Sequence, residues 1–140
     1  MVRKARKSDL NKILKLLKYG ASSGKVLTRS KPDILQSINN FFVCVEGKQV
    51  VGCVSLDIYS PKLAEIRSLV VDPSYQRKGI GSLLVENCLM EAKKQEIFEV
   101  LAITDKDKFF DGLGFRKSIE EKHPMFVKLD VGYNKKGNKE

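Results

Sequence analysis

The residues Ser68-Leu69-Val70-Val71-Asp72-Pro73-Ser74-Tyr75-Gln76-Arg77-Lys78-Gly79-Ile80-Gly81 form an apolar run that passes into a basic, glycine-bearing turn. An amphipathic segment of helical period follows, so the order strand, turn, helix is predicted. The first backbone N–H groups of a helix have no acceptor within it, and the aligned peptide dipoles place about half a positive charge there. The two glycines let a ligand approach the backbone, and the arginine and lysine add charge at the rim. This turn is therefore predicted to bind a phosphate or pyrophosphate group.

Two common nucleotide motifs do not account for the turn. A dinucleotide fingerprint would need a third glycine at the position of Leu84, which is apolar, and the Gly-Lys-Ser/Thr end of a P-loop is absent. A lone Gly-x-Gly is also compatible with an ordinary strand-to-helix turn. The choice between these interpretations depends on a longer match.

The whole string from Val70 to Leu84 resembles the acyl-CoA pyrophosphate loop of the GNAT acyltransferase superfamily, whose core signature is Gln/Arg-x-x-Gly-x-Gly/Ala. Three further segments resemble that family in the same order. Residues 2–9 are similar to its first strand and helix cap, residues 49–53 to its hairpin into the third strand, and residues 109–115 to its late Phe-Tyr-x-x-x-Gly-Phe motif. The chain is identified as a GNAT-like N-acetyltransferase.

This resemblance implies an α/β fold, with a mixed, mostly antiparallel sheet flanked by about four helices in a single domain over residues 1–130. It implies acetyl-CoA as co-substrate, used in direct transfer without a covalent enzyme intermediate. The strand that ends near Asp72 is expected to carry a bulge and to splay from the next strand. The pantetheine arm is expected along Leu69, Val70 and Val71, bonded by the backbone groups of Leu69 and Val71, and Phe109 and Phe110 are expected as core and CoA-wall residues. The pyrophosphate is expected on the loop residues Gln76, Arg77, Lys78, Gly79, Ile80, Gly81 and Ser82.

A narrower likeness concerns the amine that accepts the acetyl group. Residues 26–30 and 64–69 are similar to segments of the acetyltransferase domain of N-acetylglutamate synthases. This likeness implies that Arg29 and Arg67 line the acceptor pocket as a two-cation clamp for a dicarboxylate. It favours L-glutamate as the acceptor and arginine biosynthesis as the setting. The alternative for Arg29 is an ordinary solvated arginine.

Glu65 is the expected general base. A strand over residues 63–72 would place Glu65 and Arg67 on one face with Leu63, Leu69 and Val71. In the functional interpretation, Glu65 accepts a proton from the attacking ammonium, directly or through water. The alternative is an exposed cross-strand ion pair of Glu65 with Arg67 or a neighbour.

The group that protonates the leaving thiolate is open. Phe110 stands where many family members have a tyrosine, and phenylalanine cannot donate a proton. The thiolate can take its proton from water, because a thiol pKa of about 8.5 makes it a good leaving group. The other candidate is the hydroxyl of Thr104, which also fits a helix N-cap before residues 105–110.

Local patterns predict the remaining elements. Ser8 is expected to cap a helix that breaks near residues 20–24, and Ser30 a second helix with Pro32 in its first turn. Other helices are expected after Gly81 and over residues 106–112. Strands are expected over residues 41–45, 50–56 and 63–72, with a buried strand over 98–103 and two closing strands over 115–117 and 125–129. Residues 131–140 form a polar tail that is expected to be disordered.

Composition bounds the class of protein. A chain of 140 residues with 42% hydrophobic residues fits one domain with an ordinary core. No apolar run approaches the roughly 18 residues of a membrane span, and the N-terminus lacks a signal-peptide pattern, so a cytoplasmic protein without membrane contact is expected. Cys44, Cys53 and Cys88 are expected to be buried thiols, and with His123 as the single histidine no metal is expected.

The net charge of +9 raises the question of nucleic-acid binding. Lys and Arg are scattered along every segment instead of clustering with aromatic residues, and no nucleic-acid-binding motif is found, so no nucleic-acid partner is expected. A solvated basic surface or electrostatic steering of anionic substrates accounts for the charge. Two other functions stay open: a protein lysine or N-terminal amine acetyltransferase, and a non-catalytic acyl-CoA-binding regulatory module. A homodimer stays open as well.

Overall fold

The structure is a computed structural model of the 140-residue chain, and it describes residues 1–24 and 26–129. The chain divides into two compact units, Met1–Ala102 and Ile103–Glu140. The tail predicted at residues 131–140 lies outside the described residues. The boundary of the predicted domain at residue 130 stays a prediction.

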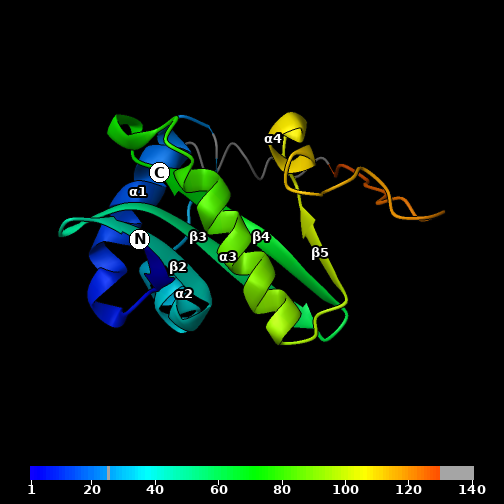
Figure 1. The fold of residues 1–140 in the computed structure, drawn as a ribbon, viewed down its shortest axis with the longest axis horizontal. Coiled ribbons are helices and arrows are strands. Elements are labelled where there is room, and N and C mark those ends of the chain that lie inside the picture. The colour runs from blue at the N-terminus through cyan, green and yellow to red at the C-terminus, as the bar shows by residue number, and fades with distance from the viewer. Residues whose placement is uncertain (25, 130–140) are drawn as a thin grey trace. The chain divides into compact units, whose positions relative to one another are not determined.

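A five-stranded sheet with strands in sequence order forms the first unit (Figure 1). Three antiparallel pairings join β1 to β4, and β5 pairs parallel to β4. The mostly antiparallel mixed sheet that the sequence predicts is therefore confirmed. The strands are β1 (Val2–Lys4), β2 (Phe41–Glu46), β3 (Gln49–Ser60), β4 (Leu63–Val71) and β5 (Glu99–Ala102).

The helices of this unit are α1 (Leu10–Ser22), α2 (Lys31–Gln36) and α3 (Ile80–Lys94). Ser30 caps α2 as predicted, because its hydroxyl accepts from the Asp33 N–H. The predicted cap of α1 is wrong: Ser8 lies inside a 3₁₀ turn, Lys7–Asp9, and Asp9 precedes the helix. The Asp9 carboxylate accepts a hydrogen bond from the Arg6 N–H and forms a bidentate ion pair with Arg3. A buried carboxylate therefore stabilises this turn, where the sequence predicted a serine cap.

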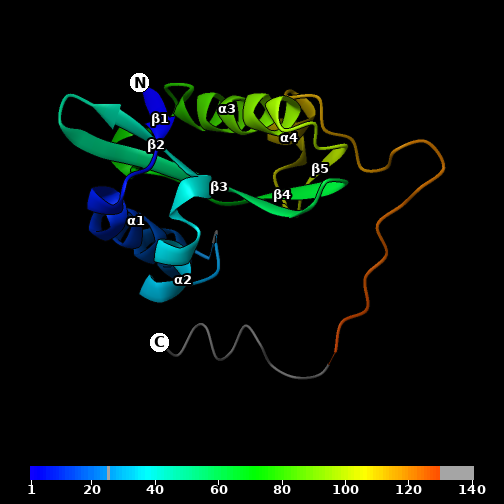
Figure 2. The same ribbon diagram turned by 90° about the horizontal axis from the view of Figure 1, so that it is seen from below.

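Helices cover both faces of the sheet, with α3 on one face and α1 and α2 on the other (Figure 2). Fully buried side chains of β2 and β3, such as Val43 and Cys53, pack under α1 with Ile13 and Ile34. On the opposite face α3 lies close over β3, because a Cβ atom on Gly52 would come within 3.1 Å of Leu84 and 3.2 Å of Ile80. This close packing fixes where α3 begins.

A β-bulge interrupts the pairing of β3 with β4. Cys53 pairs with Val70 and Ser55 with Arg67, so Ser68 and Leu69 together oppose one residue of β3. Ser68 takes a left-handed backbone angle, with φ of 57°. The strand bends at this point, and its pairing with β5 runs only from Leu63 to Ile66.

The second unit contains α4 (Asp107–Asp111), close to the predicted helix. The two closing strands predicted at 115–117 and 125–129 are wrong: the only β pairing within residues 103–129 is an isolated bridge between Ile119 and Lys122. The side chains of Met125, Phe126 and Val127 are exposed, and a strand-forming sequence does not make a strand without a partner.

The strand predicted as buried at 98–103 is shorter and half-exposed as β5, with Phe98 72% exposed. None of the helices in residues 1–24 and 26–129 combines the length and the apolar character needed to cross a membrane.

Candidate active site

The predicted anion-binding turn connects β4 to α3. After a 3₁₀ turn, Pro73–Tyr75, the chain passes Arg77 and Gly79 with positive φ angles of 65° and 78°. The first helical bond of α3 runs from the Leu83 N–H to the Gly79 carbonyl. The N–H groups of the three preceding residues, Ile80, Gly81 and Ser82, therefore have no acceptor within the helix. The first turn of α3 carries no acidic residue and no side-chain cap, so this end of α3 suits an anion.

The basic side chains of the turn are exposed, as a rim around the helix end requires. Arg77 and Lys78 both lie at the surface, and the Lys78 ammonium is 5.1 Å from the centre of the Tyr75 ring. The Gln76 side chain donates to the Val71 carbonyl at 3.1 Å and so ties the turn to the end of β4. The structure thus brings together the loop residues that the sequence predicts.

The edge of β4 beyond the bulge is open within residues 1–102. The Asp72 N–H donates to the Val51 carbonyl of β3. Because the backbone groups of successive strand residues point to alternate sides, those of Val70 also point toward β3, and those of Val71 point away from it. No strand of the first unit pairs with β4 on that side beyond Ile66. A ligand with amide groups could pair with this edge. Three strand residues were expected to contact the pantetheine arm. The backbone groups of Leu69 and Val71 lie on the open edge, whereas those of Val70 point to β3 and its side chain packs under α1.

Arg29 is the centre of a polar cluster on the α1/α2 face of the sheet. Its side chain is only 4% exposed. Nε donates to Asp33 at 2.9 Å, and Nη1 donates to the hydroxyls of Ser55 and Ser68 at 3.1 Å each. The guanidinium also lies 5.2 Å from the Phe41 ring centre, a cation–π contact. The solvated arginine considered from the sequence is therefore wrong, since Arg29 is buried against β3 and the bulge of β4.

Arg67 joins this cluster through Asp57. Its Nη1 donates to Asp57 Oδ2 at 2.9 Å, and the same oxygen is 3.7 Å from Arg29 Nη1. Partial burial of Arg67 disfavours its charge, but the attraction and hydrogen bond of Asp57 outweigh this, and the pKa of Arg67 is raised. The two arginines that the sequence nominates thus meet at one carboxylate.

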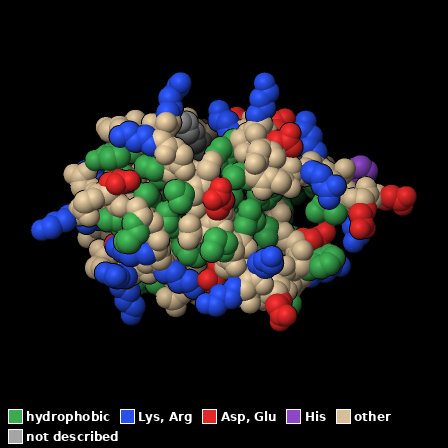
Figure 3. Space-filling view, in the orientation of Figure 1, with side chains coloured by type: hydrophobic (Ala, Val, Ile, Leu, Met, Phe, Trp, Pro, Cys, Tyr) green, Lys and Arg blue, Asp and Glu red, His purple; other side chains and the backbone are tan. Residues whose placement is uncertain are grey.

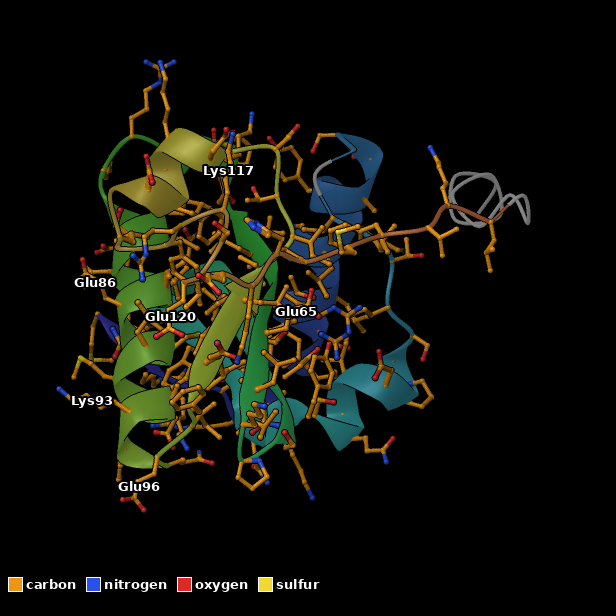
Figure 4. All side chains as sticks on the ribbon, turned by 90° about the vertical axis from the view of Figure 1, so that its right-hand side faces the viewer. Glu65, Glu86, Lys93, Glu96, Lys117 and Glu120 are labelled. Atoms are coloured by element: carbon orange, nitrogen blue, oxygen red, sulfur yellow. The ribbon has the colours of Figure 1, made fainter. Side chains whose placement is uncertain are left out.

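Glu65 lies on the side of β4 away from α3 (Figure 4). The hydroxyl of Tyr59 donates to Glu65 Oε1. Desolvation and this hydrogen bond raise the pKa of Tyr59 to about 12. The ion pair of Glu65 with Arg67 that the sequence left open is absent from the described residues, because Arg67 pairs with Asp57 instead.

Four members of this cluster were missed by the sequence reasoning: Ser55, Asp57, Tyr59 and Ser68. Three of them stand at alternate positions of β3, and period two alone would place them on one face. What the sequence does not reveal is the register that sets Asp57 opposite Glu65 and Ser55 opposite Arg67. That register includes the bulge, which the family resemblance implies in this strand but no local residue pattern marks.

Three further predicted site residues lie in the second unit. The Thr104 hydroxyl accepts the Lys106 N–H at 2.8 Å, and Lys106, not Thr104, precedes α4. The predicted N-cap role of Thr104 is therefore wrong, although its hydroxyl does order the turn before the helix. Phe109 and Phe110 form an edge-on pair with ring centres 4.9 Å apart.

The buried cysteines are unsuited to nucleophilic chemistry. Burial raises the pKa of both Cys53 and Cys88 to about 12, so neither forms a thiolate at neutral pH. Residues 1–24 and 26–129 contain no group of three or more His, Cys, Asp or Glu side chains that could hold a metal ion. On the face shown in Figure 3, the described Lys and Arg side chains project at many separate places instead of forming one patch.

Comparison with known proteins agrees with this geometry. A family model described as the acetyltransferase (GNAT) domain matches residues 37–117, more than half of the 140-residue chain. An uncharacterized N-acetyltransferase of Chlorobaculum tepidum is 36% identical over 129 residues, which cover 92% of this chain and 83% of that protein. An amino-acid acetyltransferase of Mycobacterium tuberculosis is 33% identical over 120 residues, which cover 82% of this chain and 67% of that protein.

Solved structures with bound CoA are also similar to this chain. A Mycobacterium tuberculosis protein in complex with CoA and a second ligand is 32% identical, with a TM-score of 0.78 over 86% of this chain and 73% of that one. N-acetylglutamate synthase from Neisseria gonorrhoeae, in complex with coenzyme A and N-acetyl-glutamate, shares the fold with a TM-score of 0.79 at 23% identity. The match spans 99% of this chain but only 32% of the synthase. With the loop at the start of α3 and the open edge of β4, these matches show that the chain belongs to the GNAT family and is an acetyl-CoA-dependent N-acetyltransferase.

Proposed function

We propose that the acetyl acceptor is a small amine that carries a carboxylate, with L-glutamate as the favoured acceptor. The observation that carries this proposal is the convergence of Arg29 and Arg67 on Asp57, on the same sheet face as Glu65. Guanidinium groups recognise carboxylates by paired, charge-assisted hydrogen bonds. A pair of arginines beside a carboxylate base therefore suits a substrate that is both an acid and an amine.

Each guanidinium has donors left for a ligand. Arg29 uses Nε and Nη1 within the protein, and Arg67 uses Nη1. Among the described residues, no acceptor is bonded to Nη2 of Arg29 or to Nε and Nη2 of Arg67. Arg67 is also 36% exposed, so a substrate can reach it. Arg29 would act as a fixed donor and Arg67 as an accessible one.

Glu65 would take the proton of the substrate ammonium, directly or through one water. The freed amine nitrogen attacks the thioester carbonyl, a C–N bond forms, and the C–S bond breaks. As the amide forms, the nitrogen loses its second proton to water, and the leaving thiolate takes a proton from water, so the products are the N-acetyl amine and CoA. The open N–H groups of β4 beside Leu69 and Val71 are suited to polarising the carbonyl, as an oxyanion hole does.

The names of two similar proteins support the acceptor class. One relative is called an amino-acid acetyltransferase, and a structural neighbour is an N-acetylglutamate synthase crystallised with N-acetyl-glutamate. The chain spans a third or less of the synthase and of several other amino-acid acetyltransferases, such as that of Pasteurella multocida at 27%. The acceptor is therefore argued mainly from the Arg29, Asp57 and Arg67 cluster.

An acceptor screen that follows release of free CoA tests the proposal. Amino acids with a side-chain carboxylate should be acetylated faster than simple amines of similar basicity. Arg67→Lys should raise the KM for the acceptor by about tenfold with little change in the KM for acetyl-CoA, because lysine lacks the fork geometry. Arg6→Lys, on an exposed arginine outside the cluster, is the matched control.

Two results would overturn the proposal. If peptides with a free lysine or a free N-terminus react faster than every amino acid, the chain is a protein acetyltransferase. If no amine releases CoA although acetyl-CoA binds, the non-catalytic alternative replaces it.

A further inference from the structure

Tyr59 stands near the end of β3, across from Glu65 on β4. The residue is 55% exposed, so its side chain contributes little to the core. Its hydroxyl donates to Glu65 Oε1, and no other hydrogen bond to the Glu65 carboxylate is made by the described residues. The one polar contact of Tyr59 is therefore with the proposed base.

Several charged groups surround this pair. Asp57 lies directly opposite Glu65 on β3, and Arg67 follows Glu65 on the same face of β4. Arg29 reaches the cluster from the segment before α2 through Asp57. On β5, Glu99 shares this face, opposite Leu63, because parallel partners point to the same side. Arg67 pairs with Asp57 and not with Glu65, and among residues 1–24 and 26–129 only Tyr59 donates a hydrogen bond to the Glu65 carboxylate.

We propose that Tyr59 is a positioning residue for the base: its hydroxyl fixes Oε1 of Glu65 and leaves Oε2 as the atom that accepts the ammonium proton. This inference deepens the proposed function, because it rests on Glu65 as the base. A carboxylate held at one oxygen presents the other in a defined direction, which proton transfer requires.

The hydroxyl remains a donor over the whole working range of pH. Desolvation and the bond to Glu65 raise the pKa of Tyr59 to about 12, so the phenol stays neutral. It can therefore donate to Oε1 of Glu65 throughout this range of pH.

The decisive variant is Tyr59→Phe, which removes the hydroxyl and keeps the ring. The kcat should fall about three- to tenfold. The KM for acetyl-CoA should not change.

Tyr19→Phe, on a half-buried tyrosine of α1, is the matched control and should leave kcat and the KM for acetyl-CoA unchanged. A double variant tests whether Tyr59 acts through Glu65. In a Glu65→Gln background, Tyr59→Phe should have no further effect on kcat, because the two side chains act as one unit.

The outcomes separate the two levels of inference. If Glu65→Gln loses activity but Tyr59→Phe keeps the wild-type kcat, the role of Tyr59 is refuted and Glu65 remains the base. If Glu65→Gln turns over at a near-normal rate, Glu65 is not the base, and the role of Tyr59 falls with it.

Discussion

Gly81→Asp should raise the stability of the free protein and reduce the stabilisation that acetyl-CoA gives. Gly81 is the second residue of α3, next to the N–H groups that have no helical acceptor. A carboxylate there faces the positive end of the helix dipole, which stabilises a helix by about 0.3–1 kcal/mol. The same charge repels a bound pyrophosphate. For charges a few ångströms apart near a surface, this repulsion costs about 2 kcal/mol, which weakens acetyl-CoA binding about 30-fold.

The effect on thermal unfolding follows from these values. For a chain of 140 residues, the unfolding entropy is about 0.3 kcal/mol per degree. Acetyl-CoA at 100 times its Kd stabilises the wild type by about 2.7 kcal/mol, or about 9 °C in Tm. At the same concentration the variant should gain only about 0.9 kcal/mol, or about 3 °C. Without ligand, its Tm should be about 1–3 °C above the wild type.

Differential scanning fluorimetry with and without acetyl-CoA measures both shifts. Asn11→Asp is the control, because Asn11 is exposed and is the second residue of α1, the position that matches Gly81 in α3. It should leave the ligand shift unchanged. A Gly81→Asp protein with the full wild-type ligand shift would refute the assignment of the pyrophosphate to this helix end.

Three further predictions follow from described residues. Gly79→Ala should destabilise the fold by about 1–2 kcal/mol in urea unfolding, because φ is 78° and no atom lies within 4 Å of the added Cβ, so the cost is in the backbone. Cys53 and Cys88 should not react with a thiol reagent at pH 8 until the protein is unfolded, because burial raises the pKa of both to about 12; rapid labelling of the native protein would contradict this. Asp9→Asn should destabilise the fold by about 1.5–3 kcal/mol at neutral pH. The hydrogen bond from Arg3 lowers the pKa of Asp9, so its contribution is full above the unfolded value near 3.9 and is lost as pH falls through the lower folded value; urea unfolding at pH 7 and pH 3 should show the difference shrinking.

The loop at the start of α3 could be predicted from sequence because its determinants are local. The positive φ angle of Gly79, the missing cap and the basic rim all belong to a few consecutive residues. The same holds for Ser30, whose cap is set within three residues of the chain. Features that are set by consecutive residues do not depend on how distant segments pair, so they can be predicted from the sequence.

The acceptor cluster could be predicted only in part, because tertiary pairing creates it. Arg29 and Arg67 were nominated by resemblance, but the carboxylate that joins them, Asp57, comes from a third segment. Its place depends on the register of β3 with β4 and on the bulge at Ser68. The strand predicted at 125–129 failed for a related reason: a strand needs a partner as well as a suitable composition.

The backbone of Ser68 sets a limit on how stable this enzyme can become without loss of activity. A serine with φ of 57° costs on the order of 1–3 kcal/mol, and such strain is often retained at functional sites. Glycine would relieve it, but it would also remove the hydroxyl to which Arg29 donates. Selection for heat tolerance and selection for turnover therefore pull this position in opposite directions. A thermostable relative that keeps the bulge should gain its stability elsewhere in the chain.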